Sequence, residues 1–181
     1  NGSFSEYITI PDKWVEKLPK KLTSKEIMMI GTSGFTALKA LNKTLGKILK
    51  HKKIPVLVTG ALSNVGMFLI FLLINMGVSV EVVTSKKNNI KILKKMGVSE
   101  VHILRNFIKT HNFSLMKEKY SVIFENLGGN MMSVCLKYLI KKGILVSIGN
   151  ILGNISNINI LPLILREVKI FSVNAESSSK K

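Results

Sequence analysis

Short apolar runs alternate with amphipathic segments along the chain from about residue 54 onward. The runs are rich in β-branched residues and poor in charge, which is typical of strands buried on both faces of a sheet. The segments Asn64–Met76 and Lys87–Met96 are predicted to be helices that end at Gly77 and Gly97, and residues 131–141 to be another. The six predicted strands are residues 55–60, 78–84, 98–104, 120–126, 144–149 and 168–173.

This order of elements predicts how the strands are connected. Strands that alternate with helices are joined by right-handed crossovers, which give a parallel sheet with helices on both faces. We therefore expect an α/β fold with a doubly wound, six-stranded parallel sheet.

The first 53 residues do not follow this alternation. The segment LTSKEIMMIG, residues 22–31, is predicted to be a short helix that Thr23 or Ser24 caps, with Glu26 in its first turn. A longer amphipathic helix is predicted over SGFTALKALNKTLGKIL, residues 33–49. Because the chain starts inside a strand-like stretch with no obvious domain opening, we expect it to be a fragment of a larger protein.

Composition narrows the class of protein. The 181 residues suffice for one domain with a sizeable core. Cys135 is the only cysteine, which excludes a disulfide scaffold and a cysteine-based metal site. We expect it to be a buried structural thiol, and its being the only cysteine favours a reducing, cytoplasmic location for the protein. No signal peptide is visible, and the apolar run Val65–Met76 is shorter than the roughly 20 residues of a membrane span, so no membrane partner is expected.

The formal net charge of +17 raises the question of nucleic-acid binding. Lysine pairs such as Lys52–Lys53 and Lys141–Lys142 are spread along the whole chain, whereas a nucleic-acid reader concentrates its charge on one element. We expect nonspecific attraction to polyanions at low salt, and no specific nucleic-acid partner. His51, His102 and His111 fall in no metal spacing and no Ser/His/Asp pattern, so no metal site is predicted.

The stretch VTGALSNVG, Val58–Gly66, has the outline of a phosphate-binding turn between a strand and a helix. Gly60 would supply the tight turn and Gly66 the close contact of helix and strand, while free amides at the helix start would attract a diphosphate. Ser63 and Asn64 stand between them, and both side chains could donate to phosphate. By this motif alone, a nucleotide site and a purely structural turn are both open; its place after the first strand favours the nucleotide site.

The end of the second predicted strand bears on the type of nucleotide. An NAD site places Asp or Glu about 20 residues past the glycines, where it accepts from the ribose 2′-hydroxyl. Here the sequence is Val83-Thr84-Ser85-Lys86-Lys87, without a carboxylate. Hydroxyls and cations suit a 2′-phosphate and hence NADP(H), although Lys86 and Lys87 could also be two more surface lysines.

Several strings along the chain, in this order, resemble the zinc-independent medium-chain dehydrogenase/reductases. They are similar to the quinone oxidoreductase group that includes bacterial acrylyl-coenzyme A reductases. The strings are EYITIPDKWVEKLPKKLTSKEIMMIGTSGFTAL (6–38), PVLVTGALSNVG (55–66), LKKMGVSEV (93–101), FENLGGN (124–130), GILVSIGNILG (143–153) and LPLILREVKIFSVNAES (161–177).

The resemblance implies a two-domain enzyme that transfers hydride from NADPH to an activated double bond of the enoyl- or acrylyl-CoA type, or to a quinone. Residues 1–22 would end a GroES-like catalytic domain, residues 23–53 would be connecting helices, residues 54–175 an NADP-binding Rossmann domain, and residues 176–181 a tail. Most of the site for the small-molecule substrate would lie outside this chain, so the fragment is expected to be weakly active or inactive. No residue is assigned as catalytic.

The resemblance also implies which residues meet each part of NADPH. The pyrophosphate would meet Ser63, Asn64 and Val65, and the 2′-phosphate would meet Thr84, Ser85 and Lys86. Asn126 and Leu127 would lie near the adenosine or ribose. Thr32, Thr36, Gly149 and Asn150 would lie near the nicotinamide, and Gly60 and Gly66 complete the predicted set.

The chain departs from the family where Ser63 and Asn64 replace glycines, and a β-carbon there could crowd the phosphate. A degenerate, non-catalytic nucleotide-binding member is therefore the alternative hypothesis. Family members often form homodimers by pairing their sixth strands, and the apolar run VKIFSV, residues 168–173, is the candidate edge here.

Overall fold

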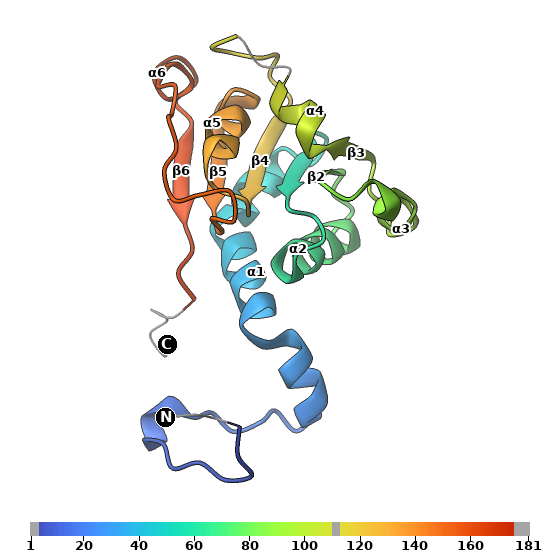
Figure 1. Cartoon of the computed structure of the whole chain (residues 1–181), viewed down its shortest axis with the longest axis vertical. Coiled ribbons are helices and arrows are strands. Elements are labelled where there is room, and N and C mark those ends of the chain that lie inside the picture. Colours follow the sequence, from blue (N-terminus) through green and yellow to red (C-terminus); the bar gives the residue numbers. More distant parts are fainter. Residues whose placement is uncertain (1–3, 110–112, 176–181) are drawn as a thin grey trace. The chain divides into compact units, whose positions relative to one another are not determined.

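The computed structural model describes residues 4–109 and 113–175, so His111 and the predicted tail at 176–181 lie outside the described residues. The described chain forms a six-stranded sheet in the order β3-β2-β1-β4-β5-β6 (Figure 1). The strands are β1 (Val56–Thr59), β2 (Val80–Thr84), β3 (Glu100–Ile103), β4 (Tyr120–Glu125), β5 (Leu139–Ser147) and β6 (Lys169–Ser172).

Every pair of neighbouring strands in this sheet is parallel. The central strands β1, β2 and β4 are buried along their whole length, which explains why they read as continuous apolar runs rather than as alternating ones. The order 3-2-1-4-5-6 is that of a doubly wound dinucleotide-binding fold, in which the order of the strands reverses between β1 and β4. The predicted fold class is confirmed.

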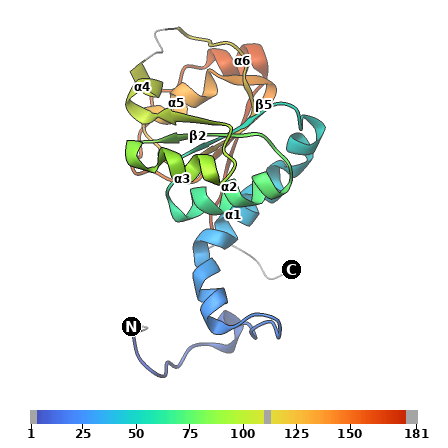
Figure 2. The same ribbon diagram turned by 90° about the vertical axis from the view of Figure 1, so that its right-hand side faces the viewer.

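Helices cover both faces of the sheet (Figure 2). The part of α1 (Ser24–Lys50) that follows Gly31 packs with α2 (Asn64–Asn75) and α3 (Ile90–Lys95) against one face, around Val58 and Phe124. On the other face α4 (Leu104–Lys109), α5 (Asn130–Leu136) and α6 (Leu161–Arg166) pack around Ile123 and Leu145. Apolar packing therefore covers both faces of the sheet, which leaves the ends of the strands for ligand sites.

The chain divides into two compact units, one up to Gly31 and one from Thr32 onward. Gly31, with φ of 47° and ψ of −158°, interrupts α1 between the two helices predicted from sequence. In the first unit, residues 12–14 form a short 3-10 helix, and Thr23 accepts from Glu26 N while its own N–H donates to the Glu26 carboxylate. This reciprocal cap is the one expected of Thr23, whereas the proposed domain boundaries remain predictions.

Two boundaries differ from the sequence-based expectation. The helix predicted over residues 131–141 ends at Leu136, because Leu139 is fully buried and pairs with Tyr120 as the start of β5. Residues 104–109, for which no helix was predicted, form α4, whose Phe107 is buried against the second face of the sheet. Among the described residues, none of the helices combines the length and apolar character that a bilayer crossing needs.

Candidate functional site: a cavity at the carboxyl ends of the strands

A cavity of about 270 Å³ opens at the carboxyl ends of β1, β2 and β4. Ligands of doubly wound folds bind at this edge, outside the carboxyl ends of the strands and beside the point where the strand order reverses. The lining residues are Gly60, Leu62, Ser63, Val83, Thr84, Ser85, Lys86, Leu104, Asn126, Leu127 and Ile151.

Half of the residues that the sequence nominated for cofactor binding line this cavity: Gly60, Ser63, Thr84, Ser85, Lys86, Asn126 and Leu127. Three more, Asn64, Val65 and Gly66, form the first turn of α2 beside it. The remaining four do not line the cavity. Thr36 is buried on α1 and donates to the Thr32 carbonyl, while Gly149 and Asn150 follow β5.

The glycines of the first turn are required by its backbone geometry. Gly60 has a φ of 61°, in the left-handed region that favours glycine, and a Cβ on Gly66 would lie 2.5 Å from the Gly60 carbonyl oxygen. Helix α2 thus approaches the end of β1 so closely that no side chain fits between them. This requirement holds whether or not a ligand binds there.

The amino end of α2 offers donors to an anion. Among the residues that the structure describes, none accepts a hydrogen bond from the backbone N–H of Asn64 or Val65. The next amide is occupied, because Ser63 caps the helix and its Oγ accepts from Gly66 N at 3.1 Å. Two free amides at the positive end of a twelve-residue helix suit a phosphate group.

The end of β2 adds hydroxyls and a cation to the same cavity. Thr84 is buried and its Oγ1 accepts from Lys86 N at 3.2 Å, which fixes the turn, while Ser85 and Lys86 are exposed. No carboxylate lines the cavity in the described part of the chain. This part of the cavity is therefore suited to a negatively charged group.

A buried acidic residue that sequence reasoning missed organises the opposite wall. Glu125 Oε1 accepts from Thr59 Oγ1 at 3.0 Å and from Leu127 N at 2.8 Å, and Oε2 accepts from Gly128 N at 2.8 Å. Burial raises the pKa of Glu125 above its ordinary value, although the hydrogen bonds from Gly128, Leu127 and Thr59 oppose the shift. The signal was a lone acidic residue at the end of an apolar run, just before two glycines.

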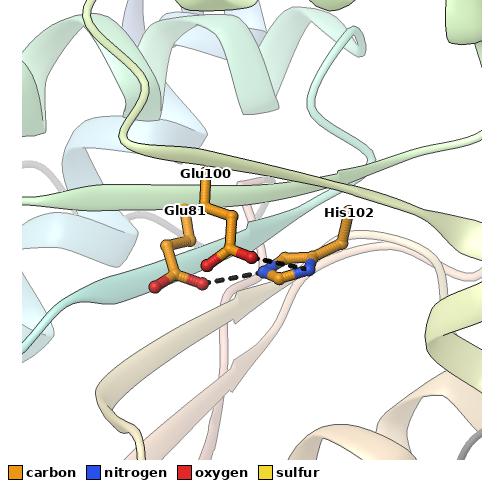
Figure 3. Close-up of side chains that lie close together, drawn as sticks. All are labelled: Glu81, Glu100 and His102. Carbon is orange, nitrogen blue, oxygen red and sulfur yellow. Dashed lines mark hydrogen bonds and ion pairs between the residues drawn. The ribbon is translucent and has the colours of Figure 1, made fainter.

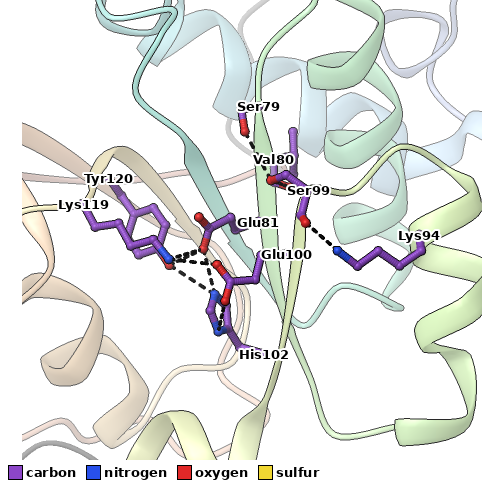
Figure 4. Close-up of polar contacts among 9 residues, drawn as sticks. All are labelled: Ser79, Val80, Glu81, Lys94, Ser99, Glu100, His102, Lys119 and Tyr120. Carbon is purple, nitrogen blue, oxygen red and sulfur yellow. Dashed lines mark hydrogen bonds and ion pairs between the residues drawn. The ribbon is translucent and has the colours of Figure 1, made fainter.

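A second polar cluster lies nearer the other end of the strands, where Glu81, Glu100 and His102 come together from β2 and β3 (Figure 3). Their side chains are of the types that bind divalent cations. However, Lys119 Nζ lies 2.7 Å from Glu81 Oε2 and 3.1 Å from Glu100 Oε2 (Figure 4). The ammonium group already supplies the positive charge that a metal would bring, so we assign this cluster to structure.

Three side chains contact the Glu81 carboxylate. Besides Lys119, the same Glu81 oxygen meets His102 Nε2 at 2.7 Å and accepts from Tyr120 OH at 2.8 Å. Burial alone would raise the pKa of Glu81, but the hydrogen bonds from His102, Lys119 and Tyr120 and the charge of Lys119 outweigh it and lower the pKa to about 2. Glu81 therefore stays ionised and ties β2, β3 and β4 together.

Comparison with known proteins fits the fold. The profile of a family described as zinc-binding dehydrogenase matches residues 64–180, well over half of the chain. The chain belongs to this zinc-binding dehydrogenase family. The family name assigns no zinc to this chain, and its zinc independence stays a prediction.

Individual relatives agree with the predicted resemblance. YhfP of Bacillus subtilis, named as a candidate quinone oxidoreductase, is 29% identical over 97% of this chain and 53% of its own length. The acrylyl-CoA reductase AcuI of Ruegeria pomeroyi is 25% identical over 96% of this chain and 53% of its own length. The chain therefore spans about half the length of the curated relatives it matches.

Solved structures of similar proteins carry nicotinamide nucleotides. YhfP with NAD bound superposes with a TM-score of 0.88 at 28% identity, covering 99% of this chain and 54% of that protein. The yhdH oxidoreductase of Salmonella enterica in complex with NADP gives a TM-score of 0.83 at 26% identity, covering 91% of this chain and 50% of that protein. The chain is thus similar over most of its length to oxidoreductases that bind nicotinamide nucleotides.

Proposed function

We propose that this chain is the cofactor-binding part of an NADP(H)-dependent oxidoreductase that reduces an activated double bond, of the enoyl- or acrylyl-CoA type, or a quinone. The observation that carries the proposal is the cavity at the ends of β1, β2 and β4, which has Lys86 and two hydroxyl side chains at the end of β2 and no carboxylate among its described lining. The similarity to AcuI and to the NADP-bound yhdH oxidoreductase supports it.

The residues of this chain would act mainly by binding and orienting. The free amides of Asn64 and Val65 suit the pyrophosphate, and Lys86 beside Ser85 suits a 2′-phosphate, since a cation and hydroxyl donors satisfy a dianion. When bound, the nicotinamide supplies the hydride chemistry. Asn126 and Leu127 would hold the adenosine or ribose, and Thr32, Thr36, Gly149 and Asn150 would lie near the nicotinamide.

The same proposal covers the substrate site and the GroES-like catalytic domain. Residues 1–22 would be the end of a GroES-like catalytic domain, and most contacts to the small-molecule substrate would come from that domain. We therefore propose that this chain alone binds cofactor but turns over poorly. A cytoplasmic location stays a prediction from the single cysteine.

Nucleotide fluorescence titration of the chain tests the cofactor. We expect NADPH to bind at least about tenfold more tightly than NADH, because a charge-assisted contact to the 2′-phosphate is worth roughly 1.5–3 kcal/mol. Equal affinity for the two nucleotides would contradict the roles of Ser85 and Lys86. A preference for NADH would assign NAD(H) as the cofactor instead of NADP(H).

A degenerate, non-catalytic member is the second candidate, and one observation favours it. The Ser63 side chain caps α2 and occupies the Gly66 amide, which a glycine at position 63 would leave free for phosphate. If the turn has lost its cofactor, the double variant Ser63→Gly/Asn64→Gly should bind NADPH while the native chain does not. Tight NADPH binding by the native chain would exclude this candidate.

We also propose that β6 pairs with β6 of a second copy. This strand is the last in the sheet, so one of its edges carries no neighbouring strand in the described fold. Analytical ultracentrifugation should then detect a dimer at micromolar concentration, and the variant Phe171→Lys on β6 should weaken it. A monomer at high concentration would contradict the pairing for this chain.

A further inference from the structure

A second cavity, of about 510 Å³, lies at the end of the sheet opposite to the cofactor cavity. It is formed by the carboxyl end of α1, the first half of β5 and the start of β6, all within the unit that begins at Thr32. Five of its seven lining residues are lysines: the lining consists of Lys47, Lys50, His51, Lys141, Lys142, Ile144 and Lys169.

The positive charges of this cavity are largely uncompensated. Glu167 lies 3.5 Å from Lys141 and 3.8 Å from Lys142, and it is shared between them. Within the described chain, Lys47, Lys50 and Lys169 have no carboxylate within 4 Å. Five lysines less this one carboxylate leave four positive charges around the cavity.

These charges repel one another in the folded chain. Burial and the charges of Lys50 and Lys142 lower the pKa of Lys47. Burial and the charges of Lys47 and Lys50 likewise lower the pKa of His51. The negative end of the α1 helix dipole favours positive charge at Lys47 and Lys50. It does not explain the positive charges on β5 and β6, which come from Lys141, Lys142 and Lys169.

The backbone at the rim is also unusual. Lys142 has a φ of 58° and Glu167 a φ of 51°, and in the described residues they are the two non-glycine positions with positive φ. Such a conformation is costly for residues with long side chains and is over-represented at functional sites. Lys142 lines the cavity, whereas Glu167 is the left-handed C-cap of α6 and is linked to the cavity by its ion pairs with Lys141 and Lys142.

We propose that this cavity binds a compact anion that carries two or more adjacent phosphate groups. A linear triphosphate carries about four negative charges and so matches the four positive ones, and lysines bind phosphate as point charges. The cavity lies within the roughly 300–1,000 Å³ that small-molecule sites occupy, and a nucleic-acid duplex would not enter it. The site is separate from the proposed cofactor cavity and does not depend on the proposed oxidoreductase function.

Inorganic tripolyphosphate is the probe for a calorimetric titration of the 181-residue chain. Two variants remove charge from the cavity: Lys47→Gln/Lys50→Gln, and Lys50→Gln/Lys142→Asn, in which Asn tolerates the positive φ at position 142. The matched control, Lys91→Gln/Lys95→Gln on α3, removes the same charge from exposed positions elsewhere. We expect each cavity variant to weaken binding about tenfold or more and the control less than about twofold.

The location of the anion is read from the His51 imidazole signals in NMR spectra. Tripolyphosphate should shift the His51 signals and leave those of His102 in place, and Lys86→Ser in the cofactor cavity should not change the effect. Unshifted His51 signals, or equal weakening by the control variant, would overturn the proposal. ATP as a second arm should compete with tripolyphosphate; a single-stranded oligonucleotide that binds the same lysines more tightly than either would overturn the assignment to a compact anion.

Discussion

Thr59 Oγ1 and Glu125 Oε1 lie 3.0 Å apart and join the carboxyl ends of β1 and β4 by a buried hydrogen bond. Thr59 also accepts two hydrogen bonds from the residue that follows β4, since Asn126 N donates to its Oγ1 at 2.9 Å and Asn126 Nδ2 to its carbonyl at 2.8 Å. The two strands meet where the sheet order reverses. The hydrogen bonds of Thr59 and Glu125 therefore hold the wall of the proposed cofactor cavity at Asn126 and Leu127.

Replacing Glu125 tests this connection. In Glu125→Gln the amide group cannot accept from all three donors, so either Gly128 N or Leu127 N loses its acceptor. We expect the free energy of unfolding to fall by about 1–3 kcal/mol, as for a buried unsatisfied donor, and NADPH binding to weaken. Urea unfolding and nucleotide titration measure the two effects. Unchanged stability would show that the wall does not depend on Glu125.

The raised pKa of Glu125 gives this variant a pH dependence. An acid whose pKa is raised on folding contributes stability that is complete below its ordinary pKa of 4.5 and is lost as the pH rises through the folded value. The difference in unfolding free energy between the native chain and Glu125→Gln should therefore be larger at pH 4 than at pH 7. Urea unfolding at both pH values measures it, and the opposite order would contradict the direction of the shift.

Glu81 should respond to acid in the opposite sense. Its pKa is lowered from 4.5 to about 2, so its ionised form contributes stability above pH 4.5 that is lost as the pH falls toward 2. We expect Glu81→Gln to cost on the order of 1–2 kcal/mol at pH 7, less than the full shift because water screens the partly exposed Lys119, and the cost to shrink toward pH 3. Urea unfolding series at pH 7, 5 and 3 measure it.

The exposed Glu100 provides the control for Glu81. Its side chain is 53% exposed and it meets Lys119 at 3.1 Å, so Glu100→Gln should cost less than about 0.5 kcal/mol at every pH. A Glu81→Gln effect that stays constant from pH 7 to pH 3 would mean that packing rather than charge holds β2, β3 and β4 together.

Two adjacent lysines allow a matched test of cofactor choice. Lys86 lines the cavity at the end of β2, whereas Lys87 begins the next short helix and does not line it. Lys86→Ser should weaken NADPH binding about tenfold and leave NADH binding within about twofold, while Lys87→Ser should change neither. Fluorescence titration with both nucleotides measures this. Equal effects of the two substitutions would show that Lys86 has no specific role in the choice between NADPH and NADH.

Two glycines in helices should respond in opposite ways to the same substitution. A Cβ on Gly66 would lie 2.5 Å from a backbone oxygen, so Gly66→Ala should destabilise the chain by about 2 kcal/mol or more. Gly46 lies within α1 with open space around it, so Gly46→Ala should stabilise the chain by about 0.5–1 kcal/mol. Thermal unfolding of both variants measures the contrast, and a stable Gly66→Ala would contradict the tight turn.

The sequence predicted the features that depend on local pattern. The capped start of α1 at Thr23 follows from a short motif, and the parallel sheet follows from the alternation of strands and helices. The cavity-lining residues at the ends of β1 and β2 also follow, because the first turn of such a sheet has a fixed place in the chain. These predictions need no knowledge of which residues meet across long distances.

The sequence could not predict features that depend on distant partners. Residues 137–141 suit a helix as well as a strand, and the pairing of Leu139 with Tyr120 decides for the strand. Glu81 lies in an apolar run without a local partner, and its role appears only when Lys119 and Tyr120 are beside it. The roles of Glu125 and of the lysines at the amino ends of β5 and β6 are hidden for the same reason.

The order of strands has a consequence for synthesis of the chain on the ribosome. Leu57 of β1 pairs with Ile123 of β4, and each neighbouring pair in the sheet is parallel, so no two strands can form a hairpin by themselves. The centre of the sheet therefore cannot close until β4 has emerged from the exit tunnel. Until then the apolar β1 and α2 of the nascent chain have no final partner on that side, and their exposed apolar surface is prone to aggregate.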